Sequence, residues 1–278
     1  MNLFRAELCK SFESQKVIKL ITGIDNLDIS NILSMVKAAE LSGVTYLDIV
    51  ANTKVVQLLK SISSLPICAS SISPIELYNC VIAGADLVEI GNFDFCYRQG
   101  IYLTSLEILS LVKEVRSLVG NVDICVTIPY YMSFYEQIKL AQDLEFLNVN
   151  ILQTESVFTE NKLAASPLLN NNIFNSLSPS CLSLLSTYLI SSNVQLPIIT
   201  SSSINNLSSP LALSLGASGV GIGSKVKQQV DITRMANYLK SLHYLMNSMN
   251  LKILSKSNNQ FKDLLFNIVD SYSIDIMV

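Results

Sequence analysis

The stretch AGADLVEIGN, residues 83–92, contains the pattern that decides the fold: a glycine able to end a helix, then a short apolar strand carrying one carboxylate. Similar units follow three other glycines, so the chain contains a weak internal repeat. Five residues after Gly43, Gly84, Gly120 and Gly216 come Asp48, Glu89, Cys125 and Gly221, and two residues further on come Val50, Gly91, Thr127 and Gly223. Equivalent positions of the repeat should therefore face the same way in one sheet.

Short β-rich runs alternate with longer segments of helical spacing from residue 16 onward, which is typical of βαβ units and a parallel sheet. We predict eight strands, at residues 17–23, 46–50, 66–70, 87–92, 123–129, 148–156, 197–202 and 219–224. Eight units favour a closed barrel over an open sheet, because closure removes both exposed edges. The predicted fold is α/β: a single (β/α)₈ TIM barrel over residues 1–244, with a C-terminal helical extension of residues 245–278 packed on it.

The composition excludes several classes of protein. A net charge of −3 lacks the excess of Lys and Arg that binding a nucleic acid backbone requires. The apolar residues come in short blocks without a run of about 18, so no membrane span is expected. Six cysteines without a C-x-x-C pair and one histidine give no ligand set for a metal. The N-terminal residues carry two glutamates and no apolar signal core, which indicates a protein that works where it is made.

A glycine-rich segment, LGASGVGIGSKV at residues 215–226, is a candidate phosphate site. Glycines let a backbone approach a ligand closely, and a helix that begins at Ser224 would present unpaired N–H groups to an anion. Many barrels bind phosphate between the loops after strands 7 and 8. Alternatively, the glycines only relieve crowding and the serines form a solvated loop. The predicted phosphate-binding residues here are Thr200, Ser201, Ser202, Gly221, Gly223 and Ser224.

A second constellation is a set of polar side chains that period-two register points into the barrel. A lysine and carboxylates confined together must pair, and the resulting pKa shifts suit general acid/base or Schiff-base chemistry. A purely structural ion network is the alternative, and a bulge in strand 6 would turn Thr154 inward instead of its neighbours. The candidate catalytic residues are Lys19, Asp48, Glu89, Thr127, Gln153 and Glu155.

The third candidate is EIGNFDFCYRQG, residues 89–100, which begins in strand 4 and continues into the following loop. Loops after the strands of a barrel lie on the face where ligands bind. Asn92 is therefore a candidate ligand contact, and Arg98 can pair with a carboxylate or a second phosphate. The alternative is that the aromatic residues of this segment only cap the mouth of the barrel.

At these segments the chain resembles the conserved hypothetical chloroplast reading-frame family numbered twenty-three, encoded in plastid genomes. The similarity covers most of residues 1 to about 245, through KLITGIDNLD, YLDIVAN, AGADLVEIGNFDFCYRQG, VTIPY, LAQDLE, QTES and LGASGVGIGSKV. That family resembles the ribulose-phosphate-binding barrels, which implies the fold and a plastid-encoded protein of the stroma, but no reaction. The sequence departs from the pattern of phosphate-binding barrels at residues 201–203, where serines replace a glycine, and at Ser156, where the family's motif tends to end in glycine.

These observations lead to an uncharacterised plastid barrel that binds a small phosphorylated metabolite at its C-terminal face, with enzymatic activity left open. As an isomerase, lyase or aldolase-type enzyme it would use Asp48 or Glu155 for proton transfer, and Lys19 to orient, to neutralise or to form an imine. The alternative is a non-catalytic barrel that senses a metabolite or scaffolds partners. A third hypothesis is a flavin-phosphate barrel holding FMN, although no residue requires a cofactor or metal. The apolar C-terminal residues also favour a homo-oligomer.

Overall fold

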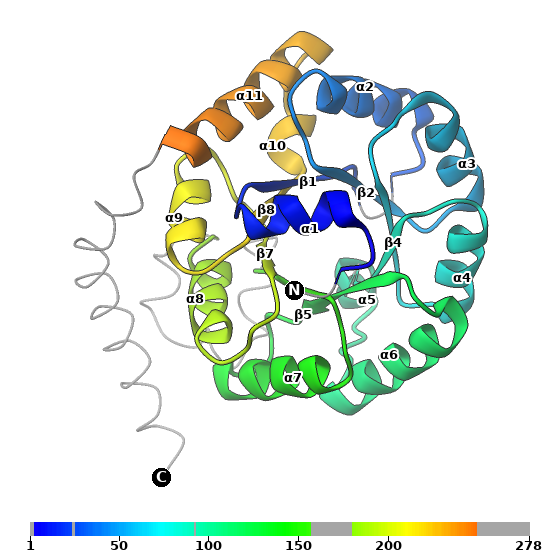
Figure 1. The fold of residues 1–278 in the computed structure, drawn as a ribbon, viewed down its shortest axis with the longest axis vertical. Coiled ribbons are helices and arrows are strands. Elements are labelled where there is room, and N and C mark those ends of the chain that lie inside the picture. The colour runs from blue at the N-terminus through cyan, green and yellow to red at the C-terminus, as the bar shows by residue number, and fades with distance from the viewer. Residues whose placement is uncertain (1–2, 24–25, 92, 157–179, 249–278) are drawn as a thin grey trace.

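Eight parallel strands form a closed barrel in the order β1 to β8, and the predicted fold class is confirmed (Figure 1). The structure is a computed structural model that describes residues 3–23, 26–91, 93–156 and 180–248. Within these residues the strands are Val17–Ile21 (β1), Tyr46–Val50 (β2), Ile67–Ser71 (β3), Leu87–Ile90 (β4), Asp123–Ile128 (β5), Ile151–Thr154 (β6), Ile198–Thr200 (β7) and Gly219–Ile222 (β8).

Most of the helices surround the barrel and cover the outer face of its strands (Figure 1). The described helices are Ala6–Glu13 (α1), Ile29–Glu40 (α2), Thr53–Ile62 (α3), Pro74–Ile82 (α4), Phe93–Arg98 (α5), Ser105–Val119 (α6), Phe134–Phe146 (α7), Ser180–Ser191 (α8), Ser208–Ser214 (α9), Ser224–Lys227 (α10) and Ile232–Ser248 (α11). Their buried faces pack on the outward side chains of the strands, in two large apolar clusters. Alternate strand residues are therefore left to fill the lumen.

Local sequence signals fix the ends of several helices. Thr104 and Ser133 begin α6 and α7 with complete capping boxes, in which the side chain of the third helical residue bonds back to the cap. At the opposite ends, the glycines of the repeat adopt a positive φ that favours glycine. These values are 76° at Gly43, 110° at Gly84, 60° at Gly120 and 102° at Gly216. The repeat read from the sequence is thus a repeat of helix ends.

Seven of the eight predicted strands differ from the observed ones by one to three residues at one end or both, and two boundaries of the prediction need comment. Strand β6 begins at Ile151 and not at residue 148, because Asn148 has a φ of 56° and turns the chain ahead of the strand. The division proposed at residues 244 and 245 falls inside α11, which continues to Ser248. Residues 249–278 lie outside the described part of the chain, so the C-terminal helical extension stays a prediction.

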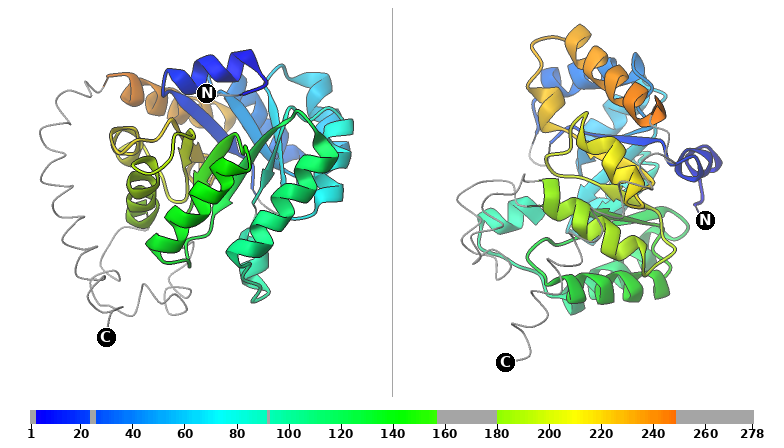
Figure 2. Two further views of the ribbon diagram at one scale, coloured as in Figure 1. Left: turned by 60° about the horizontal axis from the view of Figure 1, so that its bottom comes forward. Right: turned by 90° about the vertical axis from the view of Figure 1, so that its left-hand side faces the viewer.

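Helix α1 was not predicted, and it closes the N-terminal end of the barrel. It lies across that end in Figures 1 and 2, with Leu8 and Phe12 directed into the lumen cluster. Two carboxylates hold the residues before it. The backbone N–H groups of Phe4 and Arg5 donate to Asp123, and the Arg5 guanidinium pairs with Asp86.

The lumen is filled in two layers of different chemistry. The lower layer, next to α1, is mostly apolar and consists of Val17, Tyr46, Cys68, Leu87, Cys125, Ile151 and Ile199. The upper layer lies two residues further along the same strands, towards their C-terminal ends. Its members are Lys19, Asp48, Ser70, Glu89, Thr127, Gln153, Ser201 and Gly221, all buried.

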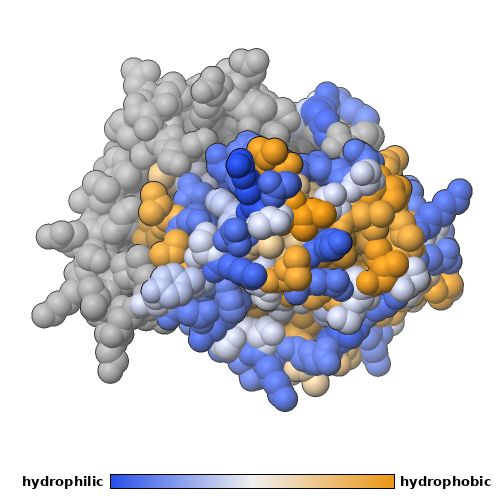
Figure 3. All heavy atoms as spheres, turned by 90° about the horizontal axis from the view of Figure 1, so that it is seen from above, coloured by the Kyte–Doolittle hydropathy of each residue, from blue (hydrophilic) through white to orange (hydrophobic). Residues whose placement is uncertain are grey.

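The outer surface is partly apolar. Leu41, Ile62 and Ile82, at the ends of α2, α3 and α4, are at least half exposed. In the view of Figure 3, apolar side chains gather on the side that corresponds to the right of Figure 1. None of the helices in the described ranges is long and apolar enough to span a membrane. The predicted homo-oligomer stays a prediction.

Candidate functional site

Lys19 is the centre of the upper layer. Its side chain is completely buried, and its ammonium group contacts three acceptors from three other strands. Nζ lies 2.8 Å from Asp48 Oδ2 and 2.7 Å from Gln153 Oε1, and it also pairs with Glu89 Oε2. The period-two register that pointed these side chains inward is therefore correct, including Gln153 on β6.

Glu89 is held from its other oxygen as well. Its Oε1 accepts hydrogen bonds from Thr127 Oγ1 at 2.9 Å and from Gln153 Nε2 at 2.8 Å. Gln153 Nε2 also donates to Thr127 Oγ1 at 3.1 Å. Five of the six candidate catalytic residues thus form one connected network, which closes on itself around Glu89.

Sequence reasoning missed Ser70. Its hydroxyl donates to Asp48 Oδ1, the oxygen that Lys19 does not use. The signal was present, because Ser70 lies two residues after the inward-facing Cys68 on β3 and is the register partner of Glu89. Applying the alternation to strand 3 as it was applied to strands 2 and 4 would have found it.

The network keeps Lys19 protonated. Burial by itself would lower the pKa of Lys19, but the carboxylates of Asp48 and Glu89 outweigh burial and raise the pKa well above its usual value. For Asp48 the balance is different: burial raises the pKa to about 6, and Lys19 offsets only part of that effect. Asp48 is therefore a carboxyl group that can exchange a proton near neutral pH.

The same residues do not fit a metal ion. Ligand atoms of Asp48, Cys68 and Glu89 lie within 4.8 Å of one another, which is close enough for one cation. The Lys19 ammonium already bonds both carboxylates, and burial holds the pKa of the Cys68 thiol well above its usual value. A metal would have to displace a buried cation and bind a protonated thiol.

Glu155 does not belong to the Lys19 network. It lies just beyond β6, where it accepts a hydrogen bond from the hydroxyl of Tyr97 and one from the Tyr130 N–H at 3.2 Å. Tyr97 comes from α5, and burial followed by the nearby Glu155 charge raises its pKa well above the usual value. The ring of Tyr97 also stacks on Tyr102 with centroids 5.5 Å apart, and contacts Tyr131 edge-on. Segment 93–104 is thus tied to the end of β6 by tyrosines, in line with the alternative that it caps the mouth.

Of the other two candidates of that segment, the structure describes only Arg98. Arg98 is exposed at the end of α5. It follows β4, four strands around the barrel from β8, so it lies apart from the loops after β7 and β8. Asn92 lies outside the described residues.

The loop after β7 has an unusual backbone. Ser202 and Ser203 have φ values of 65° and 58°, a conformation that favours glycine and is uncommon for serine. Ser201 precedes them, and its hydroxyl bonds the carbonyl of Thr154 at 2.8 Å. The glycine expected after strand 7 of a phosphate-binding barrel is therefore absent in sequence, but the backbone adopts its conformation.

Gly221 and Gly223 sit beside this loop because β8 pairs with β7 and β1. A Cβ on Gly221 would lie 2.9 Å from the Ser201 Cβ, and one on Gly223 would lie 2.7 Å from the carbonyl oxygen of Ile21. These glycines are required by close packing, which is the alternative weighed for them, and packing does not exclude a ligand above them.

Thr200 does not join this group. Its hydroxyl bonds that of Thr187 on α8 at 2.7 Å, and Thr187 in turn bonds Thr154 at 2.8 Å. Thr200 and Thr154 therefore face the surrounding helix and not the lumen. This orientation does not support the prediction of Thr200 as a phosphate ligand.

Two lysines near the start and end of α10 add positive charge beside these loops. Ser224, the first residue of α10, and Lys225 are both exposed. Lys227 lies against the chain that follows β1, where a Cβ on Gly23 would meet its Nζ at 2.7 Å. Lys227 was not among the predicted site residues, although the spacing SKVK placed it one turn after Ser224.

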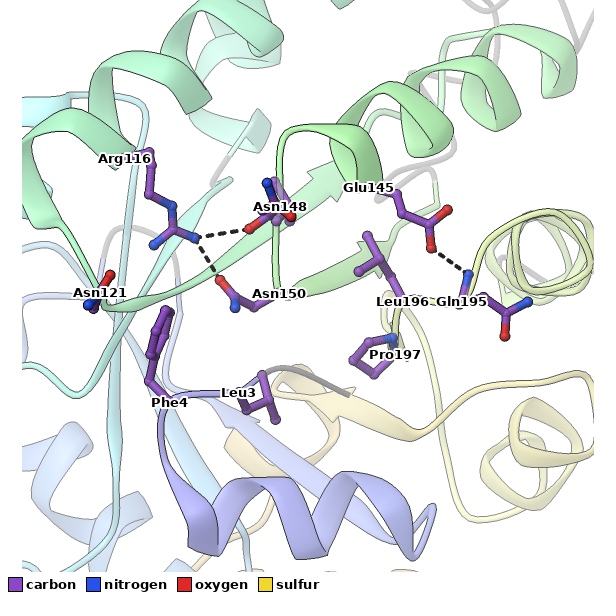
Figure 4. A pocket seen from close by; sticks show the side chains of 11 residues that line it. Leu3, Phe4, Arg116, Asn121, Glu145, Asn148, Asn150, Gln195, Leu196 and Pro197 are labelled. Atoms are coloured by element: carbon purple, nitrogen blue, oxygen red, sulfur yellow. Dashed lines mark hydrogen bonds between the residues drawn. The ribbon is translucent and has the colours of Figure 1, made fainter.

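A cavity of ≈ 760 Å³ lies at the opposite end of the barrel, next to the residues that precede β5, β6 and β7 (Figure 4). Arg116 projects beside it and donates to the carbonyls of Gly120, Val122 and Asn148 and to Asn150 Oδ1. These bonds join the loops before β5 and β6. We therefore assign this region to the stability of the barrel and place the candidate site at the C-terminal face.

Solved structures show the same fold at low sequence identity. The thiamine phosphate pyrophosphorylase from Pyrococcus furiosus is 16% identical with a TM-score of 0.54, over 84% of this chain and 96% of that one. The 3-hexulose-6-phosphate synthase from Salmonella typhimurium is 14% identical with a TM-score of 0.56, over 83% of this chain and 98% of that one. At these identities the likeness shows the barrel and nothing finer.

Comparison of sequences is more specific. The chain is 48% identical to "Uncharacterized protein ycf23" of Antithamnion sp., over 87% of this chain and 88% of that relative. It is 39% identical to the protein of the same description from Cyanophora paradoxa, over 83% of this chain and 92% of that relative. A family model described as "Protein of unknown function (DUF561)" matches residues 4–252. The resemblance seen in the sequence is thereby confirmed: the chain belongs to the DUF561 family, together with the ycf23 proteins of plastid genomes.

Proposed function

We propose that this protein binds a small phosphorylated metabolite at the C-terminal face of its barrel, in the plastid stroma, and acts on it as an isomerase, lyase or aldolase-type enzyme. The phosphate lies at the loops after β7, β8 and β1, and the rest of the ligand faces the upper layer. The proposal rests on the chemistry of that layer more than on the fold.

The observation that carries the proposal is the buried charge of Lys19, Asp48 and Glu89. Removing such charges from water costs several kcal/mol per ion, and apolar replacements of similar volume are often neutral or stabilising. The lower layer demonstrates that this barrel can be filled with mostly apolar side chains. A charged layer on the ligand-binding side of such a barrel is typical of a functional site.

The phosphate position is supported by the loop after β7. Left-handed backbone at non-glycine residues costs of order 1–3 kcal/mol each and clusters at ligand-binding sites. Ser202 and Ser203 both have this conformation, next to the glycines of β8 and the lysines of α10. Two of the structural neighbours are named for phosphorylated compounds, which favours the same class here.

Within the proposed reaction, Asp48 transfers the proton. It has a pKa of about 6 and is the carboxyl of the network with the fewer hydrogen bonds. Lys19 supplies a fixed positive charge that orients the Asp48 carboxylate. Its raised pKa leaves no free amine to attack a carbonyl, so the imine role is not part of this proposal.

The binding test is a thermal-shift titration with inorganic phosphate, phosphosugars and FMN, since a ligand of the native state raises the melting temperature. A substitution that blocks the phosphate site is also needed. Gly221→Asp would not serve, because the added Cβ would crowd Ser201 and disturb the fold. Ser224→Asp instead adds a negative charge at an exposed residue of the site, and Ser64→Asp is the matched control in an exposed loop at the other end of the barrel. We expect Ser224→Asp, but not Ser64→Asp, to abolish the shift. If no phosphorylated compound shifts the wild type, the proposal is wrong.

The turnover test is the exchange of carbon-bound hydrogen for deuterium in D₂O, followed by NMR on each phosphosugar that binds. Wild type should exchange a hydrogen next to the carbonyl, and Asp48→Asn should lose at least about a hundredfold in rate, the typical contribution of a general acid or base. Binding without exchange or any other turnover would favour the alternative, a barrel that senses the metabolite.

A further inference from the structure

The hydrogen-bond donors of the upper layer are all in use. The Lys19 ammonium has three N–H donors, and they meet Asp48, Glu89 and Gln153. The two N–H donors of the Gln153 amide meet Glu89 Oε1 and Thr127 Oγ1. The remaining donors in the layer are three hydroxyls, and each has an acceptor: Thr127 bonds Glu89, Ser70 bonds Asp48 and Ser201 bonds the carbonyl of Thr154.

Acceptor capacity is left over. A carboxylate offers about four lone-pair positions, and a hydroxyl that donates can still accept. Asp48 receives one hydrogen bond on each oxygen, from Ser70 and from Lys19. Of the three ionised residues it is also the least deeply buried, with 5% exposure against 0% for Lys19 and 2% for Glu89. The side of the layer that a ligand reaches is therefore an acceptor surface centred on Asp48 and Ser70.

The net charge of the upper layer also favours a ligand that carries hydrogen-bond donors. With all three groups ionised, Lys19 contributes one positive charge and Asp48 and Glu89 contribute two negative charges, so the layer carries a net charge of −1. In a buried setting this charge repels an anion and attracts a cation or a polarised O–H group. A carboxylate or a second phosphate over Asp48 would meet both repulsion and a lack of donors.

From this inventory we infer the substrate class: a phosphate monoester whose far end carries hydrogen-bond donors, hydroxyl or ammonium groups, and no carboxylate or second phosphate. The inference rests on the proposed function, because it takes the phosphate to lie at the loops after β7, β8 and β1. The donor groups then approach Asp48 and Ser70 from the C-terminal face.

Two matched pairs of small esters test the inference by calorimetric titration. sn-Glycerol 3-phosphate and 3-phosphoglycerate differ by a hydroxymethyl group against a carboxylate, and O-phosphoethanolamine and phosphoglycolate differ by an aminomethyl group against a carboxylate. Because the members of a pair share the phosphate, the ratio of their affinities isolates the far end. We expect wild type to bind at least one donor-bearing member about tenfold or more tightly than its partner.

Asp48→Asn brings the layer to zero net charge and supplies an amide donor, so the preference should shrink to less than about threefold. Asp143→Asn, which alters a partly exposed carboxylate on α7 that pairs with Lys139, is the control and should leave the preference intact. Titration of wild type at pH 5 and pH 8 gives a second readout that needs no substitution: protonated Asp48 is a donor, so the preference should be weaker at pH 5.

The two proposals fail in different ways. If inorganic phosphate and the esters bind wild type but the carboxylate members bind as well as their partners or better, the inferred substrate class is wrong and the phosphate site stands. If neither phosphate nor any of the four esters binds, the proposed function itself is wrong.

Discussion

The two layers of the lumen are made by the same strands and differ in almost every physical respect. The lower layer is mostly apolar, sealed by Leu8 and Phe12 of α1, and its residues contact one another without charge. The upper layer contains a buried lysine, two carboxylates and a closed set of hydrogen bonds. One step of the β alternation, two residues, separates them on each strand.

The comparison separates what stabilises the barrel from what is kept for function. Burial of the lower layer is favourable by the hydrophobic effect alone, whereas the upper layer is stable only while every member has its partner. Substitutions should therefore behave differently in the two layers. In the lower layer we expect loss of stability without loss of ligand binding, and in the upper layer we expect the two to be coupled.

The largest effect is expected for Lys19→Met. This change leaves Asp48 and Glu89 buried without their cation, which should lower the free energy of unfolding by about 3–5 kcal/mol at pH 7, measured by urea denaturation. Adding Asp48→Asn and Glu89→Gln to Lys19→Met removes the unpaired charges and should recover most of the loss, yet binding of phosphosugars should stay absent. A triple variant as unstable as Lys19→Met would show that charge is not the cause.

Phe12→Ala tests the lower layer. The side chain is 1% exposed between α1 and the lumen, so its truncation should destabilise the protein by about 3–4 kcal/mol through lost burial and a cavity. Phosphate and phosphosugar affinities, measured by calorimetry at a temperature where the variant is folded, should be unchanged. A loss of affinity in this variant would mean that the two layers are not independent.

The dependence of stability on pH should report the raised pKa of Asp48. Its folded pKa of about 6 is above the ordinary value of 3.8, so its contribution is fully present below pH 4 and is lost as the pH rises through about 6. The stability of wild type relative to Asp48→Asn should thus fall by about 3 kcal/mol between pH 4 and pH 7.

Thr127→Val should give the smallest of these effects. It removes one hydrogen bond to Glu89 and one acceptor of Gln153 while keeping the shape of the side chain, for an expected loss of about 1–2 kcal/mol. Thr154→Val is the matched change on the outer face of the wall, where Thr187 loses one hydroxyl partner and keeps Thr200. We expect both to lose similar stability, but only Thr127→Val to weaken ligand binding.

Much of this arrangement could be predicted from the sequence, because alternation along a strand is a local rule. Asp48, Glu89 and Thr127 sit at fixed distances after helix-ending glycines, so their inward direction followed once the repeat was recognised. Lys19 and Gln153 followed from the same alternation without the repeat. The alternation rule requires only that the segment be an extended strand. It held even where the predicted strand ends were off by up to three residues.

The features that could not be predicted from the sequence depend on contacts between residues far apart in the chain. Glu155 follows the alternation, yet it bonds Tyr97 instead of Lys19, because α5 brings that hydroxyl over the end of β6. Thr200 was predicted as a phosphate ligand from its place at the end of strand 7. Its hydroxyl instead bonds Thr187 on α8, a contact that the sequence does not reveal. The conformation of Ser202 is equally hidden, since serine carries no propensity for a positive φ.

The contacts of helix α1 also bear on the order in which parts of the protein fold. The helix is synthesised before all eight strands, but the carboxylate that receives the Phe4 N–H is Asp123, 119 residues later, and Asp86, which pairs with the Arg5 guanidinium, also comes later in the chain. Leu8 and Phe12 therefore have no lumen to enter until more than half of the strands exist. Until those strands are synthesised, the apolar face of α1 has no partner in the lumen, so we expect its docking to be a late step of folding.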